Sequence, residues 1–149
     1  MLVFMTQTTQ AQNPRDFELI DISIQKCLDT WVAHGASDLS RKNCLWALPK
    51  PTVEFQHAVS EYGRTNDYTQ HLAHSLLRVN HYVVESYIRL MGDGTNPDWN
   101  RTMCKYNEVV LKLLDFPFKP AKSEADAFAK KIAPRHQLVD DACKNLPQN

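Results

Sequence analysis

The longest helical pattern in the chain runs from residue 65 to residue 91. Apolar residues recur there every three or four positions, which at ~100° per residue places them on one stripe of a helix. The stripe and its flanks consist of Tyr68, Leu72, Leu76, Leu77, Val79, Val83, Val84, Tyr87, Ile88, Leu90 and Met91. Because so wide an apolar face must be buried, we expect other elements to cover this helix from two sides.

Shorter helical patterns flank this segment on both sides. Capping residues, prolines and glycines predict helices over residues 14–34, from about 37 to 47, and over 52–62 and 97–114. A last helical pattern begins after Ser123 and continues to about Leu146, with Pro134 expected to kink or restart it. The proline-containing stretches 48–51 and 115–120 are expected to be extended corners.

These patterns predict an all-α protein. No segment of convincing length alternates apolar and polar residues, and only 4 glycines accompany 43% apolar residues. We expect an irregular, mostly antiparallel bundle of five to seven helices around residues 65–91. Residues 1–12 are expected to be a disordered tail, and residues 13–146 a single helical domain.

The net charge and the cysteine spacing indicate which binding partners and which cellular compartment to expect for this protein. The 17 basic and 17 acidic residues cancel, so no overall field attracts nucleic acid or an anionic membrane. The N-terminal apolar run is too short for a signal peptide, and no stretch is long enough for a membrane span. A cytoplasmic protein is therefore expected, with four single cysteines as reduced, mostly buried thiols: Cys27, Cys44, Cys104 and Cys143.

The polar face of the long helix contains the strongest candidate for a metal site. His71 and His74 lie on adjacent turns, and Glu54 and His57 have a spacing that occurs in di-iron helical bundles. The alternative is a solvated helix face on which the histidines lie near Asp67, Arg78 and Glu85. His81 lies ~10 Å further along the axis, which excludes it from a metal bound by His71 and His74 unless another helix intervenes.

Two other groups of residues suggest binding to macromolecules. Four aromatic residues, Trp46, Trp99, Phe116 and Phe118, lie in or beside proline-bounded corners, where they could anchor a protein partner or attach the corner to the core. A basic cluster comprises Lys119, Lys122, Lys130, Lys131 and Arg135. Because Glu124 and Asp126 are interspersed with it, a solvated helix end is favoured over a nucleic-acid surface.

The sequence favours a small helical protein–protein interaction module, with a homodimer as one form of it. No glycine-rich phosphate loop, Gly-x-Ser-x-Gly or His-Glu-x-x-His motif occurs, so an enzyme is less favoured. The first alternative is a transition-metal-binding bundle that uses Glu54, His57, His71 and His74. The second is a nucleic-acid-associated protein that uses the basic cluster at residues 119–135.

Overall fold

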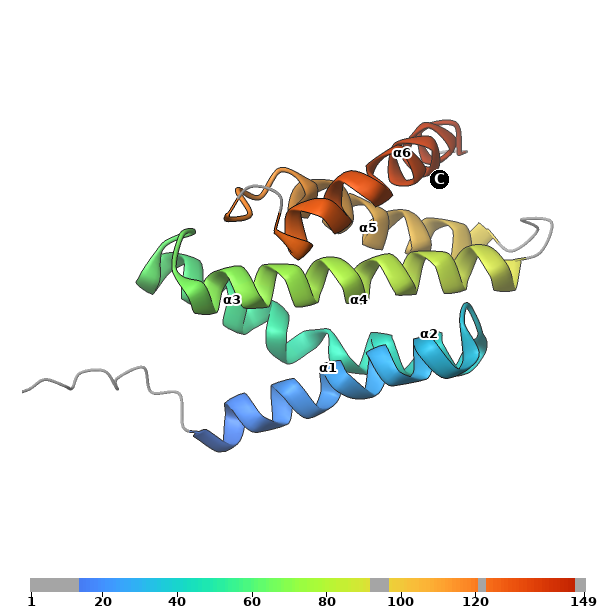
Figure 1. Ribbon diagram of the computed structural model, residues 1–149. Coiled ribbons are helices and arrows are strands. Elements are labelled where there is room, and N and C mark those ends of the chain that lie inside the picture. Colours follow the sequence, from blue (N-terminus) through green and yellow to red (C-terminus); the bar gives the residue numbers. More distant parts are fainter. Residues whose placement is uncertain (1–13, 92–96, 121–122, 147–149) are drawn as a thin grey trace, which may run out of the picture.

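The central helix α4, Asp67–Met91, lies between two layers of other helices (Figure 1). The computed structural model describes residues 14–91, 97–120 and 123–146, and for residues 14–17 and 97–99 only the backbone is described. Within these ranges the chain forms six α-helices and no strand. The predicted all-α bundle around a long central helix is confirmed.

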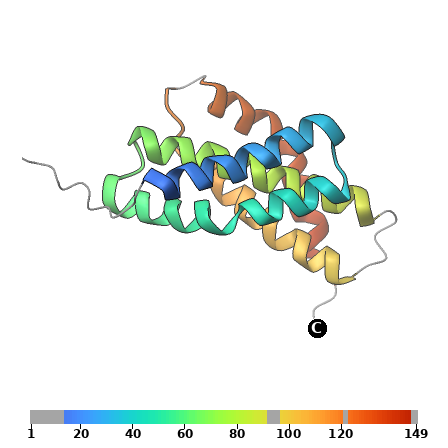
Figure 2. The same cartoon turned by 90° about the horizontal axis from the view of Figure 1, so that it is seen from below.

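One layer contains α1 (Pro14–His34), α2 (Asp38–Ala47) and α3 (Pro49–Tyr62), and the other contains α5 (Pro97–Leu114) and α6 (Glu124–Lys144). Figure 2, the view from below, shows α2 and α3 following one another in a line, with α1 lying alongside, all on one face of α4. The chain reverses direction between α1 and α2 and between α4 and α5, so these neighbours are antiparallel (Figure 1). α6 packs mainly on α5.

Side-chain caps and glycines set the helix ends. The Ser37 side chain accepts a hydrogen bond from the backbone N–H of Ser40 at the start of α2, and Ser123 does the same for Asp126 in α6. The Asn66 side-chain oxygen accepts from the N–H of Tyr68, 2.9 Å away, at the start of α4. Gly35 and Gly63 follow α1 and α3 with positive φ, a conformation that favours glycine.

The proline-rich segment around residues 48–51 is helical, so the predicted extended corner is wrong. Leu48 has helical dihedral angles, and Pro49 and Pro51 both fall in the first turn of α3. A proline costs nothing there, because backbone N–H groups in the first turn have no acceptor within the helix. Pro134 was expected to kink or restart the last helix; it lies inside α6, which continues through it to Lys144, so no new helix starts there.

The apolar face of α4 forms the centre of the core. Leu72, Leu77, Val83 and Val84 are fully buried, and Leu76, Val79 and Tyr87 are nearly so. The first layer contributes Ile20, Ile24 and Ala58 to the same core, and the second contributes Met103, Val110 and Ile132. The expectation that α4 is covered from two sides is therefore confirmed.

All four cysteines are paired, so the expectation of free thiols is wrong. Cys27 and Cys44 join α1 to α2, and Cys104 and Cys143 join α5 to α6. The partners are 17 and 39 residues apart in sequence, and spacing alone does not reveal which helix faces meet. Each bond lies within one layer, so it ties together helices that already pack against each other.

Two further predictions concern membrane-spanning helices and the N-terminal tail. None of the helices in the described ranges is long and apolar enough to cross a membrane. The tail expected at residues 1–12 lies outside the described residues, as do residues 92–96 of the loop before α5.

Replacing Leu76 with alanine should lower the free energy of unfolding by ~2 to 4 kcal/mol, because the cavity left in the core adds to the lost burial. Leu76 is 3% exposed. Urea unfolding followed by circular dichroism measures the change. Val32, 84% exposed on α1, is the matched control, and its alanine variant should change stability by less than about 0.5 kcal/mol. Equal effects of the two substitutions would contradict the proposed core.

Candidate functional site

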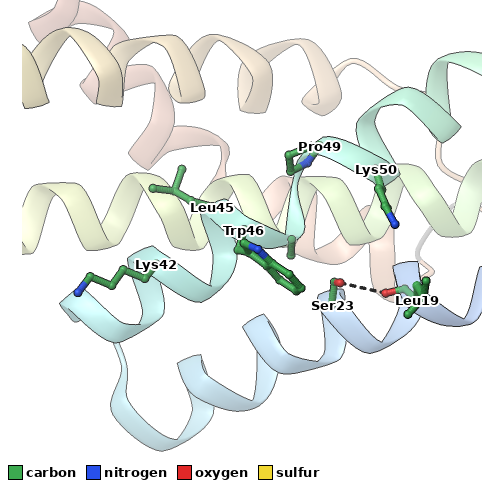
Figure 3. Close-up of a pocket in the computed structure, with 8 residues that line it drawn as sticks. Leu19, Ser23, Lys42, Leu45, Trp46, Pro49 and Lys50 are labelled. Carbon is green, nitrogen blue, oxygen red and sulfur yellow. Dashed lines mark hydrogen bonds between the residues drawn. The ribbon is translucent and has the colours of Figure 1, made fainter. Parts of the chain in front are cut away.

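An apolar groove of about 630 Å³ lies between α1 and the junction of α2 and α3. We call it the Trp46 groove, and Figure 3 shows the side chains that line it. Leu19 and Ser23 come from α1, while α2 and α3 supply the other lining residues: Lys42, Leu45, Trp46, Ala47, Pro49 and Lys50. The helical conformation of Leu48 allows one wall to continue from α2 into α3.

Trp46 is the most unusual residue of the groove, because 71% of it is exposed. Its ring extends toward α1 and Ser23 in Figure 3. Further exposed apolar side chains lie one helical turn away, Ile22 from Leu19 on α1 and Val53 from Lys50 on α3. The exposed apolar surface therefore extends beyond the groove on both walls.

The charge at the groove is positive. Lys42 and Lys50 are the charged members of its lining, and none of the eight lining residues carries a carboxylate. Lys42 pairs with Asp38 of the same helix at 3.2 Å, and its side chain is still 64% exposed. Exposed pairs of this kind are weak, so Lys42 can exchange this contact for one with a ligand.

The other three predicted aromatic anchors are placed differently from Trp46. Phe116 and Phe118 are both nearly buried, with ring centroids 5.2 Å apart, and Phe116 also packs on Phe55 of α3. These contacts favour the alternative that they attach the corner after α5 to the core. The side chain of Trp99 lies outside the described residues.

The four residues predicted to bind a metal together are divided between two environments. Glu54 is buried in α3 and accepts a hydrogen bond from the hydroxyl of Tyr68, with 2.9 Å between the oxygens. Burial and this carboxylate raise the pKa of Tyr68. His57 is partly buried, and its Nε2 atom has no hydrogen-bond partner.

His71 and His74 line a polar hollow of about 490 Å³ between α1, α4 and the start of α6. The exposed His71 approaches Asp21 of α1 at 3.6 Å, and the half-buried His74 contacts the rings of Phe118 and Phe128. No group of candidate metal ligands among the described residues combines these two histidines with Glu54 and His57. The structure therefore does not bring the four predicted ligands together: Glu54 contacts Tyr68, and the hollow lined by His71 and His74 contains no residue of α3.

A histidine pair forms where α4 meets α6. His81 Nδ1 and His136 Nε2 are 2.7 Å apart, although the two residues are 55 positions apart in sequence. His136 is fully buried, and its Nδ1 atom lies 2.6 Å from the side-chain oxygen of Asn107 in α5. The ring centroid of His81 is 6.4 Å from that of Trp31 in α1 and 5.6 Å from that of Phe128 in α6.

The hydrogen bonds around Asn107 determine which nitrogen of His136 carries the proton. The Asn107 amide nitrogen donates to the backbone carbonyl of His136 at 3.1 Å, so its amide oxygen must accept from His136 Nδ1. His136 is then protonated on Nδ1, and the lone pair of Nε2 points to His81. His81 donates its own Nδ1 proton to this lone pair.

An ion pair between Arg135 of α6 and Glu85 of α4 lies beside the two histidines. Arg135 donates from Nε and Nη2 to the two carboxylate oxygens of Glu85, at 2.9 and 3.0 Å. Burial lowers the pKa of His81 to about 4, and burial together with His81 lowers the pKa of His136 to about 4. Both imidazoles are therefore neutral at pH 7, and each can offer an unprotonated nitrogen to a ligand.

The basic cluster does not form one free surface. Lys130 forms an exposed pair with Asp126 at 3.0 Å, and Arg135 is held by both carboxylate oxygens of Glu85, so carboxylates lie beside two of its members. Lys122 lies outside the described residues. These contacts agree with the solvated helix end that the sequence favours.

Sequence reasoning identified only part of the histidine pair. His81 and Glu85 belong to the polar strip of the long helix, at a spacing of one turn. His136 and Asn107 were missed, because each lies among other polar residues of its own helix and its partner lies on another helix. Comparisons with known protein families, curated proteins and solved structures found no match to this chain.

Proposed function

We propose that this protein is an interaction module whose Trp46 groove binds an acidic amphipathic helix of a protein partner. One observation carries the proposal: a tryptophan that is 71% exposed stands beside an open, mostly apolar groove. Tryptophan is among the residues that contribute most to binding at protein interfaces. An exposed apolar surface of this kind is also costly to keep in water.

The shape and charge of the groove support a helical, acidic occupant. A groove between two helices accepts the apolar face of a third helix through side chains spaced by three and four residues. Lys42 and Lys50 lie among the lining residues, where they can pair with carboxylates on the polar face of that helix. A second copy of this chain could occupy the groove only if one of its own helices presented an apolar face flanked by carboxylates. The predicted homodimer is therefore one special case of the proposed helix binding.

The disulfides suggest where such a partner would be found. Paired cysteines persist in oxidising compartments and are rare in the reducing cytoplasm. With Cys27–Cys44 and Cys104–Cys143 both formed, we propose an oxidising compartment in place of the cytoplasm expected from the sequence. The partner helix should then belong to a protein of the same compartment.

Replacing Trp46 with alanine should weaken partner binding at least about tenfold, since the tryptophan would be the central anchor of the interface. Synthetic amphipathic helices, with one leucine-rich face and glutamates on the other, provide the probe. Titration is followed by fluorescence anisotropy of the labelled peptide, with a peptide carrying lysines in place of glutamates for comparison. Val32→Ala is the control. Val32 is on α1, is not part of the groove lining, and is more exposed than Trp46.

The proposal requires that the glutamate peptide bind better than the lysine peptide and that only Trp46→Ala weaken it. Equal binding by both variants would show that the peptide uses another surface. Sedimentation of the protein alone tests the dimer. A dimer that dissociates on Trp46→Ala substitution would place a second copy in the groove instead of the acidic helix.

A further inference from the structure

We propose that His81, Glu85 and His136 bind one zinc-class transition-metal ion between α4 and α6. One ligand atom from each of the three residues lies within 4.8 Å of the other two, and no other such group occurs in the described part of the chain. The set is distinct from the Trp46 groove and from the four residues predicted to bind metal. Two imidazoles and a carboxylate are ligands that zinc accepts with a fourth position open.

His136 has the orientation that a metal ligand requires. Histidines bound to metals almost always donate their other ring N–H to a fixed acceptor, which sets the tautomer and the ring plane. His136 donates from Nδ1 to Asn107, and the Asn107 amide is held in place by the carbonyl of His136. The Nε2 lone pair is therefore directed at the proposed metal position before any metal binds.

The spacing of the ligand atoms needs only a small adjustment. Nitrogens bound to one tetrahedral zinc at ~2.0 Å are roughly 3.3 Å apart, whereas His81 Nδ1 and His136 Nε2 are 2.7 Å apart. His81 is only partly buried, so its ring can turn outward while the buried His136 remains in place. Glu85 lies one turn after His81 on the same face of α4, which keeps its carboxylate within reach.

Protons and charges balance without a further reactant. In the metal-free protein His81 donates its Nδ1 proton to His136, and on metal binding this proton moves through solvent to His81 Nε2. Both imidazoles remain neutral, so no net proton is released. Each Glu85 oxygen accepts one hydrogen bond from Arg135 and has a further lone pair for the metal. Arg135 then acts as a positioning residue for the carboxylate.

A metal at this position would strengthen a weakly packed junction. α6 packs mainly on α5, and the polar contacts that join it to α4 include the histidine pair and the Arg135–Glu85 ion pair. A shared ion would replace the single hydrogen bond between the histidines with coordination bonds from both helices. The orientation of α6 on the bundle would then depend on metal.

Cobalt(II) titration of the metal-free, disulfide-bonded full chain tests the proposal. Stoichiometric binding should give the visible absorption of a tetrahedral cobalt centre with nitrogen and oxygen ligands, and zinc should displace it. His81→Gln and Glu85→Gln should each weaken binding at least about tenfold. His71→Gln is the matched control, because it removes an exposed histidine from the same helix, and it should bind cobalt as the wild type does.

A measurement on the wild-type protein covers the case in which a variant fails to fold. Imidazole nitrogen resonances of His136 Nε2 and His81 Nδ1 should shift on zinc binding, while those of His34 and His71 stay unchanged. The proposal is overturned if no stoichiometric cobalt binds or if His71→Gln loses affinity as much as His81→Gln. It also fails if zinc shifts the resonances of other histidines instead.

Discussion

Removing both disulfides should lower the free energy of unfolding by roughly 5 to 7 kcal/mol, a large part of the ~5 to 15 kcal/mol typical of a whole domain. The Cys27–Cys44 bond closes a chain segment of 17 residues and the Cys104–Cys143 bond one of 39. A cross-link that closes a longer loop restricts the unfolded chain more. We expect a loss of about 3 kcal/mol for the first bond and about 4 kcal/mol for the second.

Alanine pairs are the appropriate variants, because Cys27 and Cys44 are fully buried and a serine hydroxyl would be left without a partner there. Urea unfolding of each pair variant gives the two contributions, and the wild type with reductant gives their combined effect. Alkylation of native protein before reduction, followed by mass spectrometry, is the control and should label none of the four cysteines. Labelled cysteines in the unreduced protein, or a urea midpoint that reductant does not change, would contradict the pairing.

Acidification from pH 7 to pH 4.5 should destabilise the metal-free protein by on the order of 3 to 5 kcal/mol through the His81 and His136 pair. Burial lowers the pKa of both imidazoles to about 4, whereas a histidine in the unfolded chain titrates at its ordinary value near 6.5. Below pH 6.5 the unfolded chain therefore binds more protons than the native protein. Stability is fully present above this pH, decreases as the pH falls, and levels off near pH 4.

The charged groups around the pair modify this effect without reversing it. Glu85 on α4 favours protonation of both histidines, while Arg135 on α6 opposes it and Lys131 adds to this at His81. Burial of His74 lowers its pKa and contributes in the same direction. The effect of the pair should be less than twice that of one histidine, because His81 can take a proton on Nε2 and still donate from Nδ1.

Urea unfolding at several pH values, with a chelator present, measures this dependence. His71→Gln is again the control and should retain the full loss between pH 7 and pH 4.5, since His71 is exposed. His81→Gln should show a smaller loss because one of the two titrating groups is gone. An unfolding free energy that stays constant over this range would show that the native pair accepts protons as readily as the unfolded chain does.

Of the proposed metal site, the sequence could predict only the residues that lie on one helix. A wheel of residues 65–91 places His81 and Glu85 on one polar face, and a periodic pattern can show this because both lie on α4. His136 comes from α6 and Asn107 from α5, and nothing in the sequence aligns those faces with His81. The spacing of Glu54 and His57 suggested a metal site shared with His71 and His74, but Glu54 contacts Tyr68, while the hollow lined by the two histidines contains no residue of α3.

By itself the sequence determined the helices, their caps and the apolar face of α4, because these depend on residues three or four positions apart. Packing between distant helices decided the disulfide pairs, the histidine pair and the exposure of Trp46. At Pro49 and Pro51 two local rules competed, and the first-turn position that proline tolerates prevailed over the extended corner. The local pattern determines which face of each helix is buried. Which other helix covers that face depends on contacts between residues far apart in the sequence.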